Sequence, residues 1–262
     1  MRKLSPCLLL AFILFACSNP VQNLQANAMD TMTKKTVVLV HGYGKGPGDM
    51  ESLSEFLEDA GYSTVSVDLP LTFERIEDAA EVFAAEVDSI LADLPENQTI
   101  AMAGHSTGGL IIRYFLAHSQ HSNRVGHAVL IATPNKGSRL AEKMGEFSDL
   151  LVETFATLDS LRPENIASLK LYDSGDVKIG AIAGNKGDLA LGRLLEKEND
   201  GRVEVDSVYY PGLDDFIIVR FNHNEIHHKK ETAELVNRFI ETGSFMPGFS
   251  GFETTTYNAE ET

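Results

Sequence analysis

The chain has 262 residues and is acidic, with 38 Asp and Glu against 22 Lys and Arg and a formal net charge of −16 at pH 7. A surface with this charge is not attracted to nucleic acid or to anionic lipid headgroups, so we exclude functions that depend on such attraction. Both cysteines lie near the N-terminus, which leaves the remaining chain without a disulfide, a thiol nucleophile or a cysteine metal site. The remaining length suits one domain with a well-buried core.

The N-terminus has the pattern of an export signal. Two basic residues precede a ten-residue apolar run from Cys7 to Ala16, which is too short to span a bilayer, since a spanning helix needs roughly 20 residues. A basic start and a short apolar run are typical of a secretory signal peptide, which we assign to residues 1–16. The polar stretch 17–34 is predicted to be a linker.

The end of this segment bears on how the protein is anchored. The run from Leu14 to Cys17 resembles a bacterial lipobox, in which the cysteine is lipidated and becomes the new N-terminus. The resemblance implies an exported protein tethered to a membrane through Cys17, and Ser18 after it implies the outer membrane. Cleavage after Ala28 would instead release a soluble periplasmic or secreted protein, and the signal-peptide pattern favours the lipoprotein.

Strands and helices alternate through the middle of the chain. Apolar, β-branched runs predict strands buried on both faces, and apolar residues at spacings of three and four predict helices between them. The predicted strands are 36–40, 63–67, 99–103, 125–132, 177–183 and 216–221, and the predicted helices are 49–60, 74–93, 109–119 and 225–241. Because parallel strands need a helix-length crossover, this order predicts an α/β fold with a mostly parallel central sheet and helices on both faces. Ligands of such sheets bind at the carboxyl ends of the strands.

The segment 138–174 interrupts this alternation. Its apolar residues recur every three or four positions, which predicts one or two amphipathic helices inserted after a strand. An ordinary crossover needs one helix and a short loop, so the length favours a helical cap over the site rather than a helix packed on the sheet. We assign the domain to residues 35–243 and expect a polar, frayed C-terminal tail over 244–262.

The most informative motif is the pentapeptide Gly104-His105-Ser106-Thr107-Gly108, between a predicted strand and a predicted helix. Strand, G-x-S-x-G and helix together are the pattern of a nucleophile elbow, in which a tight, strained turn exposes the serine hydroxyl. Side chains in place of Gly104 and Gly108 would collide with the neighbouring strand and helix. The start of the following helix points free backbone N–H groups at the place where an oxyanion would form.

Five segments in a fixed order resemble the α/β-hydrolases and, within them, the bacterial lipases and esterases. In chain order, within about residues 35–242, they are His41-Gly42-Tyr43-Gly44, Gly104 to Gly109, Ala132 to Ser138, Asp200-Gly201-Arg202-Val203 and Asn222-His223. The resemblance implies that Ser106 is the nucleophile, His223 the base and Asp200 the acid, in the chain order of this fold. It also implies an oxyanion hole made by the backbone N–H groups of Tyr43 and Thr107.

These residue types fit one chemistry. A serine hydroxyl at its free pKa is a poor nucleophile and needs an adjacent base, and histidine suits because it titrates near neutrality. A carboxylate behind the imidazole fixes its tautomer and stabilises the imidazolium. The set predicts a serine hydrolase that cleaves carboxylic esters, with a small-molecule acyl ester or a lipid as substrate and neither a metal nor an organic cofactor.

Several positions in this prediction have competitors. His227 and His228 compete with His223 as the base, but only His223 directly follows a predicted strand. His223 and His227 lie four residues apart without a third ligand, so a metal site is disfavoured. Asp200 belongs to an Asp-Gly dipeptide, which is also common in turns. The competing acids, of which the first lies closest to a strand end, are Asp188, Asp206, Asp214 and Asp215.

Two other histidines are expected to have structural roles. We expect His105 to pack beside the elbow and His41 to shape the oxyanion loop through its own hydrogen bonds. The glycines of the stretch 42–48 match neither G-x-x-x-x-G-K-[ST] nor G-x-G-x-x-G before a helix, so a mobile oxyanion loop explains them better than a phosphate loop.

Two alternatives in function stay open. A thioesterase, amidase or acyltransferase would use the same triad, because acyl transfer to different acceptors shares its first half-reaction. A non-catalytic cell-envelope binding protein on a hydrolase fold belongs to another class of function. The complete triad disfavours that class, since a binding module does not need all three residues.

Overall fold

The computed structural model describes residues 34–147, 156–173, 175–246 and 255–257. The predicted signal peptide and Cys17 lie outside the described residues, as do nearly all of the predicted linker, part of the predicted cap insert and most of the predicted tail. From Lys35 onward the described residues belong to one unit. Among the described helices, none has both the length and the apolar character that a membrane span requires.

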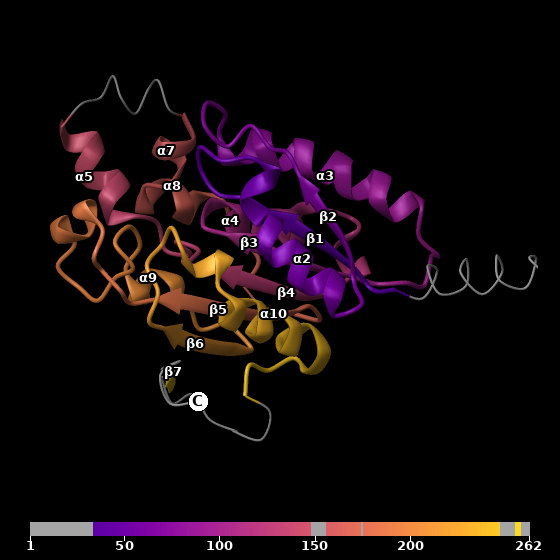
Figure 1. The fold of residues 1–262 in the computed structure, drawn as a ribbon. Coiled ribbons are helices and arrows are strands. Elements are labelled where there is room, and N and C mark those ends of the chain that lie inside the picture. Colours follow the sequence, from indigo (N-terminus) through magenta and orange to yellow (C-terminus); the bar gives the residue numbers. More distant parts are fainter. Residues whose placement is uncertain (1–33, 148–155, 174, 247–254, 258–262) are drawn as a thin grey trace, which may run out of the picture. The chain divides into compact units, whose positions relative to one another are not determined.

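In the described part of the chain, seven strands form one parallel sheet in the order β2-β1-β3-β4-β5-β6-β7 (Figure 1). The strands are β1 Thr36–Val40, β2 Ser63–Val67, β3 Ile100–His105, β4 Val125–Ile131, β5 Lys178–Gly184, β6 Asp215–Val219 and β7 Thr255–Tyr257. The parallel sheet predicted from the alternation of elements is confirmed, and all six predicted strands are present. Because the strands are parallel, their carboxyl ends meet at one edge, which is where ligands bind in such sheets.

Helices connect the strands in the order the sequence predicts. The α-helices are α2 Glu51–Asp59, α3 Ile76–Ala92, α4 Thr107–His118, α5 Arg139–Phe147, α7 Ala156–Ser160, α8 Pro163–Ser168, α9 Val205–Val208 and α10 Lys230–Thr242. The short 3-10 helices among the described residues are η1 Pro47–Met50, η2 Ser122–Arg124, η3 Ala190–Leu194 and η4 Ile226–His228. The helix predicted over 225–241 is thus two elements, because Lys229 has an extended backbone between η4 and α10.

The core lies on both faces of the sheet, as the alternation within β1 illustrates. Val38 and Val40 pack on the face that α3 and α4 cover, and Val37 and Leu39 pack on the face that α2 and α10 cover. All four side chains are fully buried. A strand buried on both faces is apolar at every position rather than at every second one. The predicted cover of helices on both faces is confirmed.

The insert after β4 contributes helices α5, α7 and α8 among its described residues. Leu161, Ile166 and Leu169 join the core on the α4 side of the sheet, so the second half of the insert packs into the body of the fold. Helix α5 instead lies beyond the carboxyl ends of β4 and β5 (Figure 1). The insert therefore combines the two roles that the sequence left open, a helix packed on the body and a helix at the site edge.

The packed part of the chain continues past the boundary expected at residue 243. Phe245 is 1% exposed, and its N–H donates to Asp215 Oδ2 at 2.7 Å. Strand β7, within the predicted tail, pairs with β6 and extends the sheet. These two features were not predicted from the sequence, because the tail is polar overall. A single buried aromatic residue and a three-residue edge strand are too short to form a recognisable sequence pattern.

A buried histidine pair ties together the loops at the carboxyl edge of the sheet. The His105 and His227 rings stack with centroids 3.7 Å apart and an interplanar angle of 19°. His227 Nε2 lies 3.0 Å from Asp49 Oδ2, and His105 Nε2 lies 3.1 Å from the His223 carbonyl oxygen. The end of β3, η1 and η4 are therefore joined at one point, and the expectation that His105 packs beside the elbow is confirmed.

Both imidazoles are held neutral in the folded protein. Burial, followed by the adjacent His228, lowers the pKa of His227 to about 4, and Asp49 opposes the shift only in part. Burial, together with His227 and His223, holds the pKa of His105 well below its ordinary value. The histidine pair is consequently stable as two uncharged rings, and protonation of either ring acts against the fold.

We predict that this pair makes stability fall in mild acid. The unfolded chain protonates His227 near its ordinary pKa of 6.5, whereas the folded chain does so only near 4. Unfolded chains thus bind more protons between these values, and the free energy of unfolding should drop by about 2 kcal/mol through this side chain as the pH falls from 7 to 4.5. Urea denaturation at the two pH values measures the drop, which should shrink in His227→Gln. Equal drops in both proteins would contradict the assignment.

Candidate active site

Ser106 lies between β3 and α4, on the turn predicted from G-x-S-x-G. Its backbone has φ 53° and ψ −123°, which side-chain-bearing residues rarely adopt, and its N–H donates to Ile131 O at 2.8 Å. A Cβ on Gly104 would lie 2.7 Å from the carbonyl carbon of Gly108, and one on Gly108 would overlap Val40 O. The steric reason predicted for the two glycines is confirmed.

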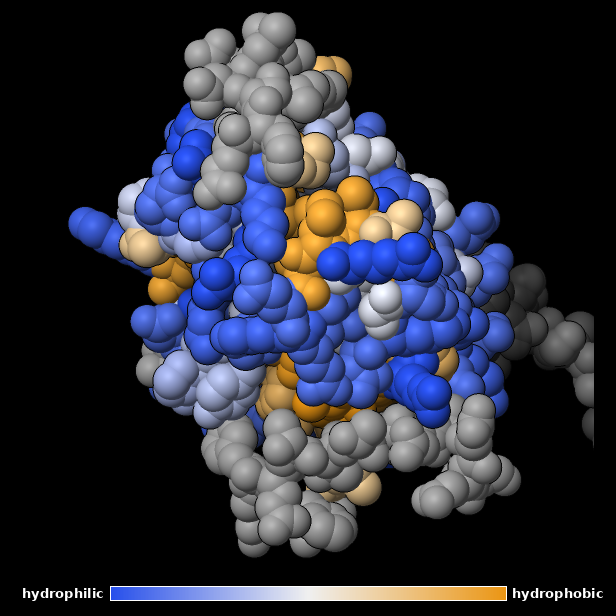
Figure 2. All heavy atoms as spheres, turned by 90° about the vertical axis from the view of Figure 1, so that its left-hand side faces the viewer, coloured by the Kyte–Doolittle hydropathy of each residue, from blue (hydrophilic) through white to orange (hydrophobic). Residues whose placement is uncertain are grey.

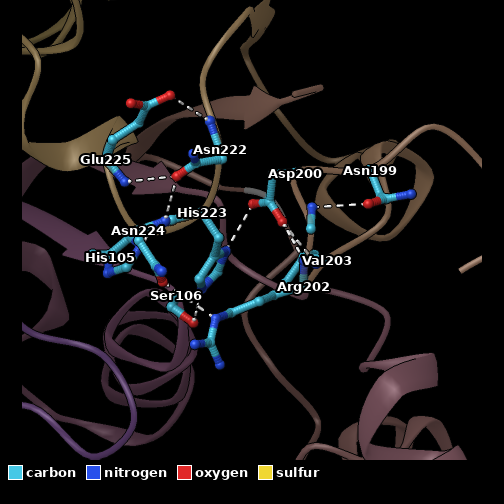
Figure 3. A network of polar contacts seen from close by, with 11 residues as sticks. His105, Ser106, Asn199, Asp200, Arg202, Val203, Asn222, His223, Asn224 and Glu225 are labelled. Atoms are coloured by element: carbon cyan, nitrogen blue, oxygen red, sulfur yellow. Dashed lines mark hydrogen bonds and ion pairs between the residues drawn. The ribbon is translucent and has the colours of Figure 1, made fainter. Parts of the chain in front are cut away.

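Three side chains from three loops form a continuous hydrogen-bonded chain (Figure 3). His223 Nε2 lies 3.0 Å from Ser106 Oγ, and His223 Nδ1 lies 2.7 Å from Asp200 Oδ2. With the Nδ1 proton donated to the carboxylate, Nε2 presents its lone pair to the serine hydroxyl. All three residues are buried, Asp200 completely. The structure thus brings together the three residues that the family resemblance implies.

Asp200 is held by hydrogen bonds to both carboxylate oxygens. Oδ1 accepts from the backbone N–H groups of Arg202 at 2.9 Å and Val203 at 2.8 Å, while Oδ2 faces His223. The His223 backbone N–H also donates to Asp200 O at 2.9 Å. Gly201 has φ 95°, so the Asp-Gly turn folds the chain back onto its own carboxylate. A fully buried charge is thereby supplied with donors, which it requires to be stable.

The competing acids are engaged elsewhere. Asp188 is exposed and pairs with Lys186 Nζ at 3.2 Å. Asp206 forms a surface ion pair with a lysine. Asp214 and Asp215 lie at the amino end of β6, the opposite edge of the sheet from Ser106. Asp188 is closer in sequence to the end of β5, but Asp200 is the residue that contacts His223.

The loop after β1 is shaped by His41, as expected from the sequence. His41 is fully buried, with Nδ1 3.0 Å from Gly42 O, and the Leu69 N–H donates to its Nε2 at 3.1 Å. These bonds fix the tautomer with the proton on Nδ1 and connect the loop to the segment after β2. A Cβ on Gly42 would lie 3.1 Å from Ser106 Cβ, so this loop passes directly beside the serine.

Two backbone N–H groups near Ser106 are free to bind a ligand oxygen. Thr107 is the first residue of α4, where helices leave their N–H groups without an intrahelical acceptor. Tyr43 follows Gly42 in the loop beside the serine and lines the pocket. Within the described part of the chain, neither the Thr107 nor the Tyr43 amide donates a hydrogen bond. Their positions match those implied for an oxyanion hole.

A cavity of about 270 Å³ opens at Ser106. Its apolar wall comes mainly from the insert and from η3, through Leu140, Ala141, Met144, Leu158, Leu161 and Leu191. Its polar wall includes Tyr43, Lys45, Arg202 and Asn224. Figure 2 faces this side of the molecule, where apolar atoms are gathered among hydrophilic side chains. The insert therefore supplies part of the pocket wall.

The η3 part of the wall belongs to a loop whose two ends are joined. Asn185 Nδ2 donates to Glu198 Oε1 at 2.9 Å, so the residues between them leave the sheet and return at nearly the same point. This loop carries Leu191 to the pocket and ends just before Asp200.

One group of described side chains has ligand types that metals use. Asp49, His105 and His227 offer oxygen and nitrogen atoms within 4.8 Å of one another. The lone pairs of an imidazole lie in the plane of its ring, and the two rings are stacked, so their nitrogens do not converge on one point. This arrangement suits a packed pair of neutral rings better than a zinc site. This group includes His227 but not His223, although those two histidines were considered together from the sequence as possible metal ligands.

The polar residues of the pocket wall that were not assigned to the site from the sequence include Arg202 and Asn224. Asn224 directly follows His223, and Arg202 lies two residues after Asp200. Their adjacency to site residues was the available signal. Spacing alone could not indicate which way either side chain points.

Comparison with known proteins identifies the family. The model of the alpha/beta hydrolase fold matches residues 35–167, half of the chain. The protein named "Putative methylesterase 14, chloroplastic" of Arabidopsis thaliana is 34% identical over 92 residues, which are 33% of this chain and 26% of that protein. GPI inositol-deacylase of Candida albicans is 24% identical over 147 residues, 52% of this chain and 38% of that protein. The matches thus span less than two fifths of the length of these relatives.

Solved structures share the fold at low sequence identity. The mature lipase BlEst2 of Bacillus licheniformis superposes with a TM-score of 0.67 at 20% identity, over 80% of this chain and 92% of that one. A metagenomic carboxyl esterase superposes with a TM-score of 0.58 at 22% identity, over 72% of this chain and 64% of that one. With the family model covering half of the sequence and the fold shared along most of it, the protein belongs to the α/β-hydrolase fold family.

Proposed function

We propose that the protein is a serine hydrolase that cleaves carboxylic esters of small acyl compounds or lipids. The observation that carries the proposal is the chain of contacts from Asp200 through His223 to Ser106, at the floor of an apolar-walled cavity. A nucleophile in contact with a base, itself oriented by a third group, is the arrangement that acyl transfer requires.

In the first half-reaction Ser106 Oγ attacks the acyl carbon while His223 Nε2 takes the hydroxyl proton. The carbonyl oxygen becomes negative, and the amides of Tyr43 and Thr107 stabilise it, at about 3 kcal/mol for each donor in comparable sites. His223 then gives the proton to the departing alcohol oxygen, and the acyl group stays on Ser106. In the second half-reaction His223 activates a water in the same way, and hydrolysis releases the acid and restores the serine.

Asp200 acts through His223. Its carboxylate keeps the ring proton on Nδ1, so that Nε2 is always the atom facing the serine, and it stabilises the imidazolium formed in each step. The two backbone donors on its other oxygen hold the carboxylate in place beside the imidazole.

The ester bond is favoured by the pocket and by the relatives. The apolar wall accommodates an acyl chain, and the similar proteins carry the names methylesterase, lipase and carboxyl esterase. Thioesters and amides pass through the same tetrahedral intermediate, so turnover of matched substrates is the way to separate the bonds.

Labelling with a fluorescent fluorophosphonate tests the nucleophile. The wild-type protein should be labelled, Ser106→Ala should not, and His223→Ala should react at least about a hundredfold more slowly, because the base is lost. Ser122→Ala, on the surface 3-10 helix η2, is the matched control and should label normally. Labelling of Ser106→Ala would refute the assignment.

The same proteins are then assayed on an octanoate ester, thioester and amide of one aromatic scaffold. Hydrolysis of the ester by wild type and its loss in Ser106→Ala are expected. Faster turnover of the thioester or amide would move the protein to the alternative hydrolases. Silence of folded wild type in both assays, with and without detergent, would favour a binding protein on a hydrolase fold.

A matched pair of substitutions tests the acid. Asp200→Asn should lower kcat at least about a hundredfold, because the amide cannot hold the Nδ1 proton of His223 in place. Asp188→Asn changes an exposed carboxylate that pairs with Lys186 and should leave kcat within about twofold. Steady-state kinetics on the preferred ester measure both. The opposite ranking would make Asp188 the acid.

We propose further that the protein is exported and tethered through a lipidated Cys17, on the signal-peptide and lipobox pattern of the sequence. In bacterial cells fed a labelled fatty acid, the wild-type protein and Cys7→Ser should carry the label, because residue 7 is removed with the signal peptide. Cys17→Ser should not carry it. A labelled Cys17→Ser protein would contradict the tether, and an unlabelled wild type would favour the soluble periplasmic or secreted form.

A further inference from the structure

The charge lining the pocket differs from that of the rest of the molecule. The whole chain has 38 acidic and 22 basic side chains. The described residues that line the pocket at Ser106 include Lys45 and Arg202 but no Asp or Glu. In a chain this acidic, a wall of cations without carboxylates indicates a site that admits negative charge.

The two cations are not equivalent. Lys45 Nζ lies 3.1 Å from Asp49 Oδ1, so its charge is already compensated. Arg202 donates from Nε to Asn224 Oδ1 at 3.3 Å, and no carboxylate among the described residues pairs with it. Its two terminal nitrogens carry four N–H groups in a planar fork, which matches the two oxygens of a carboxylate or phosphate.

The position of Arg202 relates it to one part of the substrate. Its backbone N–H binds Asp200, and its side chain binds the residue that follows His223, so the side chain crosses the site on the histidine side (Figure 3). His223 Nε2 must lie within hydrogen-bond reach of the departing alcohol oxygen to protonate it. The alcohol part of the ester therefore lies beside Arg202, while the apolar wall is left for the acyl chain.

We infer that the preferred substrates are acyl esters whose alcohol part carries an anionic group, a carboxylate or a phosphate, which the Arg202 guanidinium binds. The inference rests on the proposed ester hydrolysis and names the substrate class of that same site. Arg202 is a specificity-determining residue in this scheme. It holds the leaving alcohol against His223 and takes no part in the proton transfers. Asn224 orients the guanidinium by accepting from its Nε.

Two pairs of octanoate esters test the inference, and the two members of each pair differ by one anionic group, a carboxylate in the first pair and a phosphate in the second. The first pair has para-hydroxybenzoate and para-hydroxybenzamide as alcohols, and the second has glycerol phosphate and glycerol. The purified full-length protein should show a kcat/KM about tenfold higher for the anionic member of at least one pair, as expected for a hydrogen bond between charged groups. The pair that shows the preference identifies the anion, and the preference should weaken with added salt because Arg202 is exposed.

Substitution assigns the preference to its residue. In Arg202→Gln the ratio of kcat/KM between anionic and neutral esters should fall about tenfold, and in Arg202→Glu the neutral ester should be preferred. Arg193→Gln removes the same charge from the exposed surface of η3, outside the pocket lining, and should keep the wild-type ratio.

The outcomes separate the two proposals. A wild-type ratio near one for both pairs, or a ratio that survives in Arg202→Gln, overturns the inference and leaves ester hydrolysis standing. Failure of wild type to cleave any of the four esters or to react with the fluorophosphonate overturns the proposed function and the inference with it.

Discussion

The close approach of α4 to β1 and β3 at the nucleophile turn is the constraint on which the rest of the site depends. The helix begins one residue after Ser106, so near to β1 that a Cβ on Gly108 would overlap Val40 O. The strained backbone at Ser106 costs on the order of 1–3 kcal/mol. Burial of α4 side chains such as Ile111 and Phe115, at about 1.5–3 kcal/mol each, offsets that cost. The same approach places the Thr107 amide, at the start of α4, directly beside Ser106.

The proposed base and acid, His223 and Asp200, meet Ser106 because of the order of the strands. β5 and β6 are neighbours, so the loops after them lie together, although Asp200 and His223 are 23 residues apart. Burying a carboxylate is costly unless its lone pairs are satisfied. Asp200 meets this condition because two backbone N–H groups and one imidazole surround it. The exposed Asp188 forms an ordinary surface pair instead.

Local patterns predicted much of this protein from the sequence. The six strands, their parallel arrangement and the turn at Ser106 follow from β-branched runs and from a motif confined to five residues. What depends on distant contacts was less predictable. The apolar spacing predicted one helix over 225–241, but the extended backbone at Lys229 divides it into η4 and α10. Phe245 is buried although the tail around it is polar. The stacking of His105 on His227 and the direction of the Arg202 side chain depend on segments that meet only in the folded chain.

The hydrogen bonds that hold Asp200 come from residues after it in the chain, so the position of Asp200 does not depend on the loop that precedes it. Its partners, Val203, His223 and the intervening turn, all follow it in the chain, and the loop before it is closed by Asn185 and Glu198. We expect changes in the length of that loop to alter the pocket wall around Leu191 and to leave the Asp200 carboxylate in place, because its hydrogen-bond partners lie outside the loop. An exchange of this loop should therefore change the shape of the pocket while the contacts from Asp200 through His223 to Ser106 are kept.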